Sequence, residues 1–77
     1  MTTAKEFVNV FPDIVHIIRP QSEIENLGDY IREIYAWSKE RHFQVNLTNT
    51  WSEGNDEHTC FEVKDETQRF WFALKWK

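Results

Sequence analysis

The sequence predicts an α+β fold: one main helix packed on a three- to four-stranded, mostly antiparallel sheet, with a short N-terminal helix. Three observations predict this fold. One long stretch carries apolar residues at helical spacing, several shorter stretches alternate apolar and polar residues, and turn-forming residues separate the alternating stretches. The chain has 77 residues with two Gly and two Pro, and it contains neither a repeat nor a linker. We therefore expect one small domain over residues 1–77.

The first twenty residues combine helix and strand signals. Thr3 and Glu6 have the spacing of a capping box, which predicts a short helix over residues 3–10. Residues 14–18, IVHII, are rich in β-branched side chains and favour a strand. Pro20 should end that strand, because proline donates no hydrogen bond to a ladder. The chain would then cross over through the main helix to the rest of the sheet.

The main helix is predicted over about residues 22–41. Ser22 and Glu25 form a capping-box pattern at its start. One stripe of this segment is apolar, and it contains Ile24, Leu27, Ile31, Ile34 and Tyr35.

Three later stretches, residues 43–51, 58–64 and 68–77, alternate apolar and polar side chains and predict an antiparallel meander. In the last stretch the side facing the helix would hold Phe70, Phe72, Leu74 and Trp76. Trp71 would lie on the opposite side with the charged residues. A turn at 65–68 would set three residue pairs opposite each other: Glu62 and Trp71, Cys60 and Ala73, and His58 and Lys75.

Composition limits the compartment and the class of partner. A single cysteine excludes an internal disulfide framework, and the N-terminal residues do not form a signal peptide. No apolar run approaches the ~18 residues of a membrane span. We expect a reduced, soluble, cytoplasmic protein that does not bind membranes. The net charge is −4, and an acidic chain argues against direct nucleic-acid binding, which needs several cations on phosphates.

The sequence contains no motif for catalysis, a cofactor or a metal. Asp56, Glu57, His58 and Cys60 cluster, but they lack the paired short spacings of a zinc site. His58 and Cys60 could point to one face of a strand, yet no third group to orient a base and no oxyanion loop accompanies them. Two isolated glycines make no phosphate-binding loop. We therefore expect a protein that is not an enzyme and that holds no cofactor.

Two acidic segments and two tryptophans predict a binding surface. The acidic segments supply Glu25, Asp29 and Glu33 from the helix and Glu53, Asp56 and Glu57 from a loop. These charges would steer association with a basic partner, and Trp51 or Trp71 would anchor the complex. This composition favours a non-catalytic protein-binding module. It would be a small acidic inhibitor or immunity-type protein, as phages and mobile elements carry, occluding a basic surface of a nucleic-acid-handling partner.

The sequence also allows two alternatives to a protein-binding module. Arg69, Trp71 and Lys75 on the last strand are the kind of residues that stack and bind single-stranded nucleic acid. Trp71 could instead be buried in a structural homodimer whose sheets pair through the face that carries Trp71.

Overall fold

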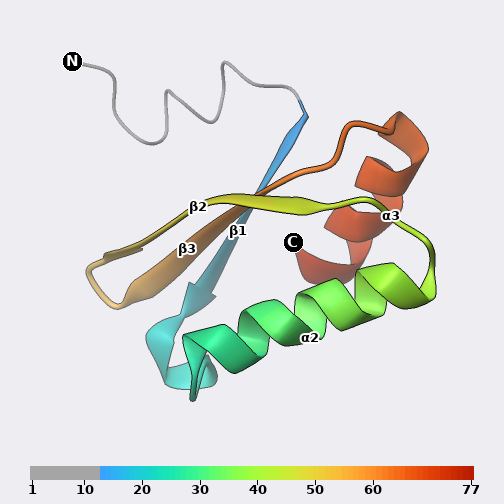
Figure 1. Ribbon diagram of the computed structural model, residues 1–77. Helices are drawn as coiled ribbons and strands as arrows, with labels where there is room; N and C mark the ends of the chain where they lie inside the picture. The colour runs from blue at the N-terminus through green and yellow to red at the C-terminus, as the bar shows by residue number, and fades with distance from the viewer. Residues whose placement is uncertain (1–12) are drawn as a thin grey trace.

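The computed structural model describes residues 13–77, and it confirms the α+β class with two helices and a three-stranded antiparallel sheet (Figure 1). The predicted helix over residues 3–10 lies outside the described residues. In chain order the elements are β1 (Ile14–Pro20), the 3₁₀ turn η1 (Gln21–Glu23), α2 (Leu27–Glu40), β2 (Asn46–Glu53), β3 (Asp56–Glu62) and α3 (Glu66–Trp76).

The sheet has the strand order β1-β3-β2, with β3 in the centre and antiparallel to both neighbours. The predicted strand over residues 14–18 is confirmed as part of β1. β2 ends later and β3 begins earlier than predicted, because the turn between them consists only of Gly54 and Asn55. Gly54 has φ of 61°, a conformation that other residues rarely adopt, so the chain reverses within two residues.

The predicted C-terminal strand is wrong, because residues 66–76 form the helix α3. The side chain of Asp65 caps this helix by accepting a hydrogen bond from the backbone N–H of Gln68 at 2.9 Å. Phe72 and Trp76, four residues apart, are both buried, which is the spacing of one helix face.

The cross-strand pairs expected for that strand are therefore wrong as well. Trp71, Ala73 and Lys75 lie on α3 and pair with no strand. The strand beside β3 on that side is β1, so the residues opposite Glu62, Cys60 and His58 are Ile14, His16 and Ile18.

The main helix begins at Leu27, five residues later than predicted. Asn26 rather than Ser22 is its N-cap, and the Asn26 side chain accepts a hydrogen bond from the N–H of Asp29 at 3.0 Å. The preceding residues form η1, and the N–H of Gln21 donates to the carbonyl of Asn55 in the β2–β3 turn at 2.8 Å. The backbone is extended at Ile24, with φ of −116° and ψ of 103°, so η1 does not continue into α2, which starts only after the Asn26 cap.

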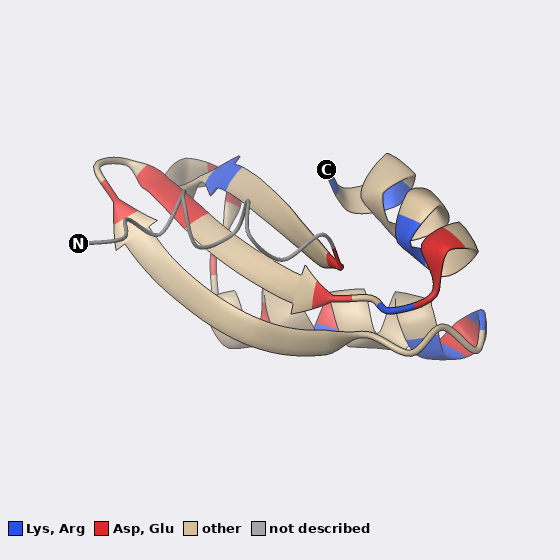
Figure 2. Ribbon diagram, turned by 90° about the horizontal axis from the view of Figure 1, so that it is seen from above, with Lys and Arg blue, Asp and Glu red and all other residues tan. Residues whose placement is uncertain are grey.

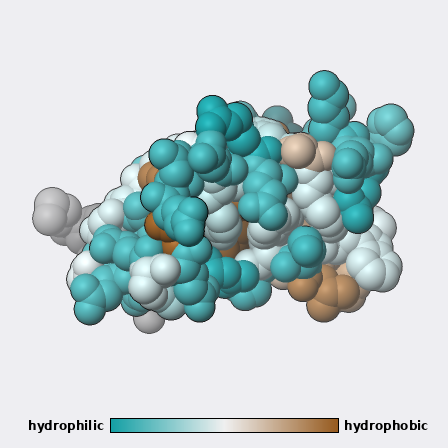
Figure 3. Space-filling model, turned by 90° about the horizontal axis from the view of Figure 1, so that it is seen from below, coloured by the Kyte–Doolittle hydropathy of each residue, from teal (hydrophilic) through white to brown (hydrophobic). Residues whose placement is uncertain are grey.

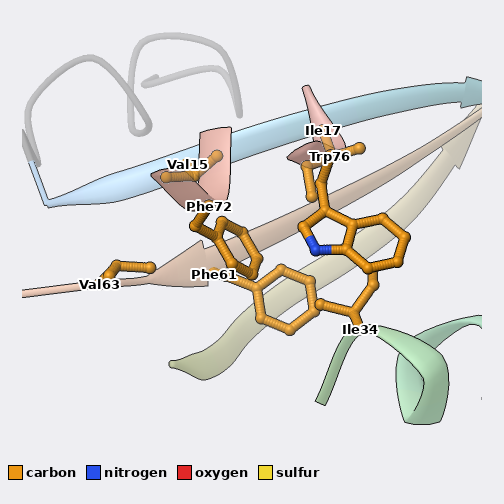
Figure 4. Close-up of a cluster of buried hydrophobic side chains, with 7 residues drawn as sticks. All are labelled: Val15, Ile17, Ile34, Phe61, Val63, Phe72 and Trp76. Atoms are coloured by element: carbon orange, nitrogen blue, oxygen red, sulfur yellow. The ribbon is translucent and has the colours of Figure 1, made fainter. Parts of the chain in front are cut away.

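Both helices pack on the same face of the sheet, where they enclose the core (Figure 4). Phe61 of β3 lies at the centre, with the ring of Phe72 at 5.4 Å and that of Tyr35 at 5.8 Å between centroids. The first pair is tilted and the second is edge to face, and aromatic pairs of this kind add to the free energy of area burial. The buried cluster consists of Val15, Ile17, Ile34, Phe61, Val63, Phe72 and Trp76.

Two arginines fasten α3 to the sheet. Near the start of α3, Nη1 of Arg69 donates to Oδ1 of Asp13 at 3.0 Å and to the carbonyl of Val63 at 2.9 Å. At the other end, Arg19 of β1 donates to the carbonyl of Trp76, one of the last carbonyls of the helix. A cation suits the negative end of a helix. Since both ends are held, α3 presents a fixed outer face to solvent.

Candidate interaction surfaces

The outer face of α3 is apolar and exposed. Phe70 is 60% exposed, Trp71 51% and Leu74 67%. The rings of Phe70 and Trp71 contact each other edge to face, with centroids 5.4 Å apart. We call these three residues the α3 surface. Since soluble proteins seldom gather large exposed side chains in one place without a use for them, this surface is a candidate contact site.

The α3 surface lies at one margin of the molecule, where a hydrophobic patch is seen (Figure 3). Charges flank it asymmetrically along the helix. Glu66 is in the first turn of α3, whereas Lys75 is in the last turn and Lys77 follows it. Figure 2 shows this order as red at the start of α3 and blue further along. The surface therefore has an apolar centre with an acidic end and a basic end.

Sequence reasoning placed two residues of this surface wrongly. Phe70 and Leu74 were expected in the core beside Phe72 and Trp76, because an alternating pattern puts all four on one side. On a helix they separate, and only Phe72 and Trp76 are buried. The signal that could have found this was Asp65 with Gln68 three positions later, a helix-start pattern. Trp71 is the one predicted site residue that belongs to the α3 surface.

The structure brings most of the predicted acidic residues to the end of the domain that holds the β2–β3 turn. Glu53 and Asp56 flank the β2–β3 turn, and Glu57 follows in β3. The hydrogen bond from Gln21 to Asn55 holds η1 against this turn, and the chain continues from there into α2. We define the acidic end as Glu25, Asp29, Glu53, Asp56 and Glu57, which come from segments separated by more than twenty residues.

Several of these acids already have partners within the chain. Asp29 forms an exposed ion pair with Arg32, and Glu57 accepts a hydrogen bond from the hydroxyl of Ser52. Glu53 lies 3.6 Å from Nε2 of His58 and is otherwise exposed. Glu33, which was grouped with them from the sequence, lies one turn of α2 beyond Asp29 and so further from the turn. The acidic end is thus a partly paired group of carboxylates, of which Glu57 is half-buried and the others are exposed.

Trp51 lies in a different environment from Trp71. It packs on the face of the sheet opposite the helices, stacked on His58 with centroids 4.7 Å apart and an interplanar angle of 11°. His16 of β1 completes this group, with its Nε2 atom 2.8 Å from Nδ1 of His58. We call these three residues the histidine cluster. Trp51 is half-buried here, so it is a packed side chain rather than a free anchor.

Cys60 lies on the same face, directly opposite His16 in the ladder, and is buried. Burial raises the pKa of its thiol to about 11. A catalytic cysteine needs the opposite shift, because the thiolate is the nucleophile. Cys60 is therefore not activated by the neighbouring histidines.

Within residues 13–77, no group of three or more His, Cys, Asp or Glu side chains could hold a metal ion. Neither α2 nor α3 is long and apolar enough to cross a lipid bilayer. A comparison with protein-family models found no match, and comparisons with curated proteins and with solved structures found no significant match either. The roles of the α3 surface and the acidic end must therefore be inferred from their own residues.

Proposed function

We propose that this domain is a non-catalytic protein-binding module whose main contact is the α3 surface. The observation that carries the proposal is the exposure of Phe70, Trp71 and Leu74 on a helix held at both ends. Tryptophan and other large apolar side chains supply most of the energy at protein interfaces when a partner excludes water from them. The helix is already ordered before binding, so little of the binding free energy would be spent on fixing its conformation.

Core packing does not require apolar side chains at the α3 surface. Phe72 and Trp76 already fill the inner face of α3, and Arg69 and Arg19 already join the helix to the sheet. Polar residues at positions 70, 71 and 74 would leave these contacts intact. The three apolar side chains lower solubility without adding to the core, and such a choice is expected where a surface has a function.

The test compares wild type with the double variant Phe70→Ser/Leu74→Ser in affinity capture from the source cells. Any protein retained by wild type alone is purified and titrated against both chains by tryptophan fluorescence. We expect a defined complex whose affinity falls at least about tenfold in the variant, since two buried apolar side chains are worth more than 1.4 kcal/mol. A complex that both chains form equally well would refute this proposal. Circular dichroism shows whether the variant keeps its fold.

A second candidate function uses the acidic end. The Gln21–Asn55 hydrogen bond gathers acids from distant segments at one end of the domain, and this favours a partner with a basic surface. Under this second candidate function, the protein is a small inhibitor or immunity-type protein that occludes the basic surface of a nucleic-acid-handling protein. The β2–β3 turn lies on the far side of the molecule from the start of α3 (Figure 2), whereas the C-terminal end of α3 bonds to Arg19, which lies opposite Glu57 in the ladder.

This second candidate has its own test. Replacing Glu53, Asp56 and Glu57 with their amides should slow association with a basic partner and flatten the salt dependence of the rate, because steering is electrostatic. Unchanged rates would remove this candidate. The single-stranded nucleic-acid alternative depended on a C-terminal strand, and residues 66–76 form a helix instead.

A further inference from the structure

The α3 surface has the features of a self-complementary contact. Its apolar residues occupy the middle of the helix, and its charges differ in sign between the two ends. If two copies of α3 pack antiparallel, the acidic end of each helix faces the basic end of the other. If they pack parallel, like charges face each other and oppose the contact.

From this arrangement we infer that the occupant of the α3 surface is a second copy of this chain, bound through an antiparallel α3–α3 contact with twofold symmetry. The inference rests on the proposed function, since it names the partner of the same surface. Phe70 of one copy packs against Leu74 of the partner copy, and Trp71 lies near the symmetry axis. Glu66 faces the basic end of the other helix, at Lys75 and Lys77. A twofold contact of this kind buries the same patch on both copies and leaves no free patch to extend into a fibre.

The area of the surface predicts how strong the contact is. At the exposures given above, the three side chains offer roughly 350 Å² per copy, given that an aromatic side chain covers about 150–250 Å². Two copies would then bury roughly 700 Å² from these side chains alone, which is below the ~1,200 Å² of a standard stable interface. The dimer should therefore be weak, and wild type should be mostly monomeric at low micromolar concentration.

The peripheral position of the patch allows two copies to approach. The hydrophobic patch lies at a margin of the face that Figure 3 shows. The histidine cluster lies on the other face of the sheet. The C-terminal end of α3 bonds to Arg19, which lies opposite Glu57 in the ladder, whereas Glu53 and Asp56 flank the β2–β3 turn beyond it. The proposed contact therefore leaves the β2–β3 turn free for a second partner.

The test is the molar mass in solution, measured by analytical ultracentrifugation from low micromolar to millimolar concentration. We expect wild type to change from monomer to dimer over this range. Leu74→Glu places a carboxylate against the partner's apolar patch and should keep the chain monomeric throughout. Ala36→Glu, on the exposed side of α2, is the matched control and should dimerise like wild type. Circular dichroism of each variant checks the fold.

A charge exchange tests the antiparallel orientation. Glu66→Lys places a cation against the basic end of the other helix and should weaken the dimer several-fold. Adding Lys75→Glu and Lys77→Glu to the same chain restores opposite charges across the contact and should recover the dimer. An effect of Glu66 on helix stability alone would not be reversed in this way.

Two results would overturn the inference. One is a wild type that stays monomeric at millimolar concentration, and the other is a dimer that Leu74→Glu leaves unchanged. The proposed function fails on a different result, a complex with another protein that is insensitive to Phe70→Ser/Leu74→Ser. A monomer that loses such a complex on mutation keeps the proposed function and refutes self-association alone.

Discussion

Nε2 of His16 lies 2.8 Å from Nδ1 of His58, so the two imidazoles form a hydrogen bond across the β1–β3 ladder. One nitrogen must carry the proton and the other must be bare, and therefore the bond exists only while at least one ring is neutral. The Glu53 carboxylate, 3.6 Å from the remaining nitrogen of His58, favours a proton on that side. In that tautomer His16 is the donor and His58 the acceptor. This bond makes the sheet face opposite the helices sensitive to pH.

Acidification should destabilise the fold through His16. Burial lowers the pKa of His16, and the nearby charges of His58 and Lys77 lower it further. The unfolded chain then takes up a proton at a higher pH than the folded chain, so the free energy of unfolding falls as pH drops below about 6.5. We expect the melting temperature to fall over this interval and to fall less in His16→Gln. Thermal denaturation followed by circular dichroism measures both.

His42→Asn is the control for this experiment. His42 is exposed and lies outside the histidine cluster, and asparagine tolerates its φ of 58°. This variant should keep the pH dependence of wild type. If His16→Gln shows the same fall in melting temperature as wild type, another group is responsible.

Sequence reasoning reached the fold class because the signals for it are local. The β-branched run of β1 and the amphipathic pattern of α2 each lie within one segment. It failed at α3, since four large apolar residues at alternate positions fit a strand, and the same segment also fits a helix with Phe72 and Trp76 inside. The Asp65 cap distinguishes the two, but aspartate also favours turns, so it fits the predicted turn before a strand as well.

The arrangement of the surfaces depended on contacts that no local pattern encodes. The acidic end is assembled by the bond from Gln21 to Asn55, which are 34 residues apart. Trp51 stacks on His58 because the ladder sets them directly opposite. Register of this kind follows from the whole sheet. The sequence therefore predicted the acidic residues as one surface but did not predict that Trp51 packs with His16 and His58.

The helix starts can be tested one residue at a time. Asn26→Ala and Asp65→Ala each remove a side-chain acceptor from an N-cap and should each cost about 1 kcal/mol of unfolding free energy. Ser22→Ala should change it by less than about 0.5 kcal/mol, because Ser22 is exposed and lies before the helix. Urea denaturation of the three variants gives the values. A larger loss in Ser22→Ala than in Asn26→Ala would place the helix start at residue 22 after all.

The two faces of α3 should differ sharply in stability. Phe72→Ala removes a fully buried ring from the centre of the core and should cost about 3–5 kcal/mol. Leu74→Ala removes an exposed side chain and should change the free energy by less than about 0.5 kcal/mol at concentrations where the chain is monomeric. Urea denaturation again measures both. Equal losses in the two variants would mean that residues 70–76 are not a helix with one buried face.

The thiol of Cys60 should be unreactive in the folded chain. With a pKa of about 11, about one thiol in a thousand is ionised at pH 8, and the side chain is also buried. Ellman's reagent should therefore react slowly in native buffer and at an ordinary rate in denaturant, where the pKa returns to about 8.5. His16→Gln should leave the native rate low, because burial rather than the histidine sets the thiol pKa. Rapid stoichiometric reaction of the native wild type would instead mean that the face beside His16 and His58 activates Cys60, and it would reopen nucleophilic chemistry as a role for that face.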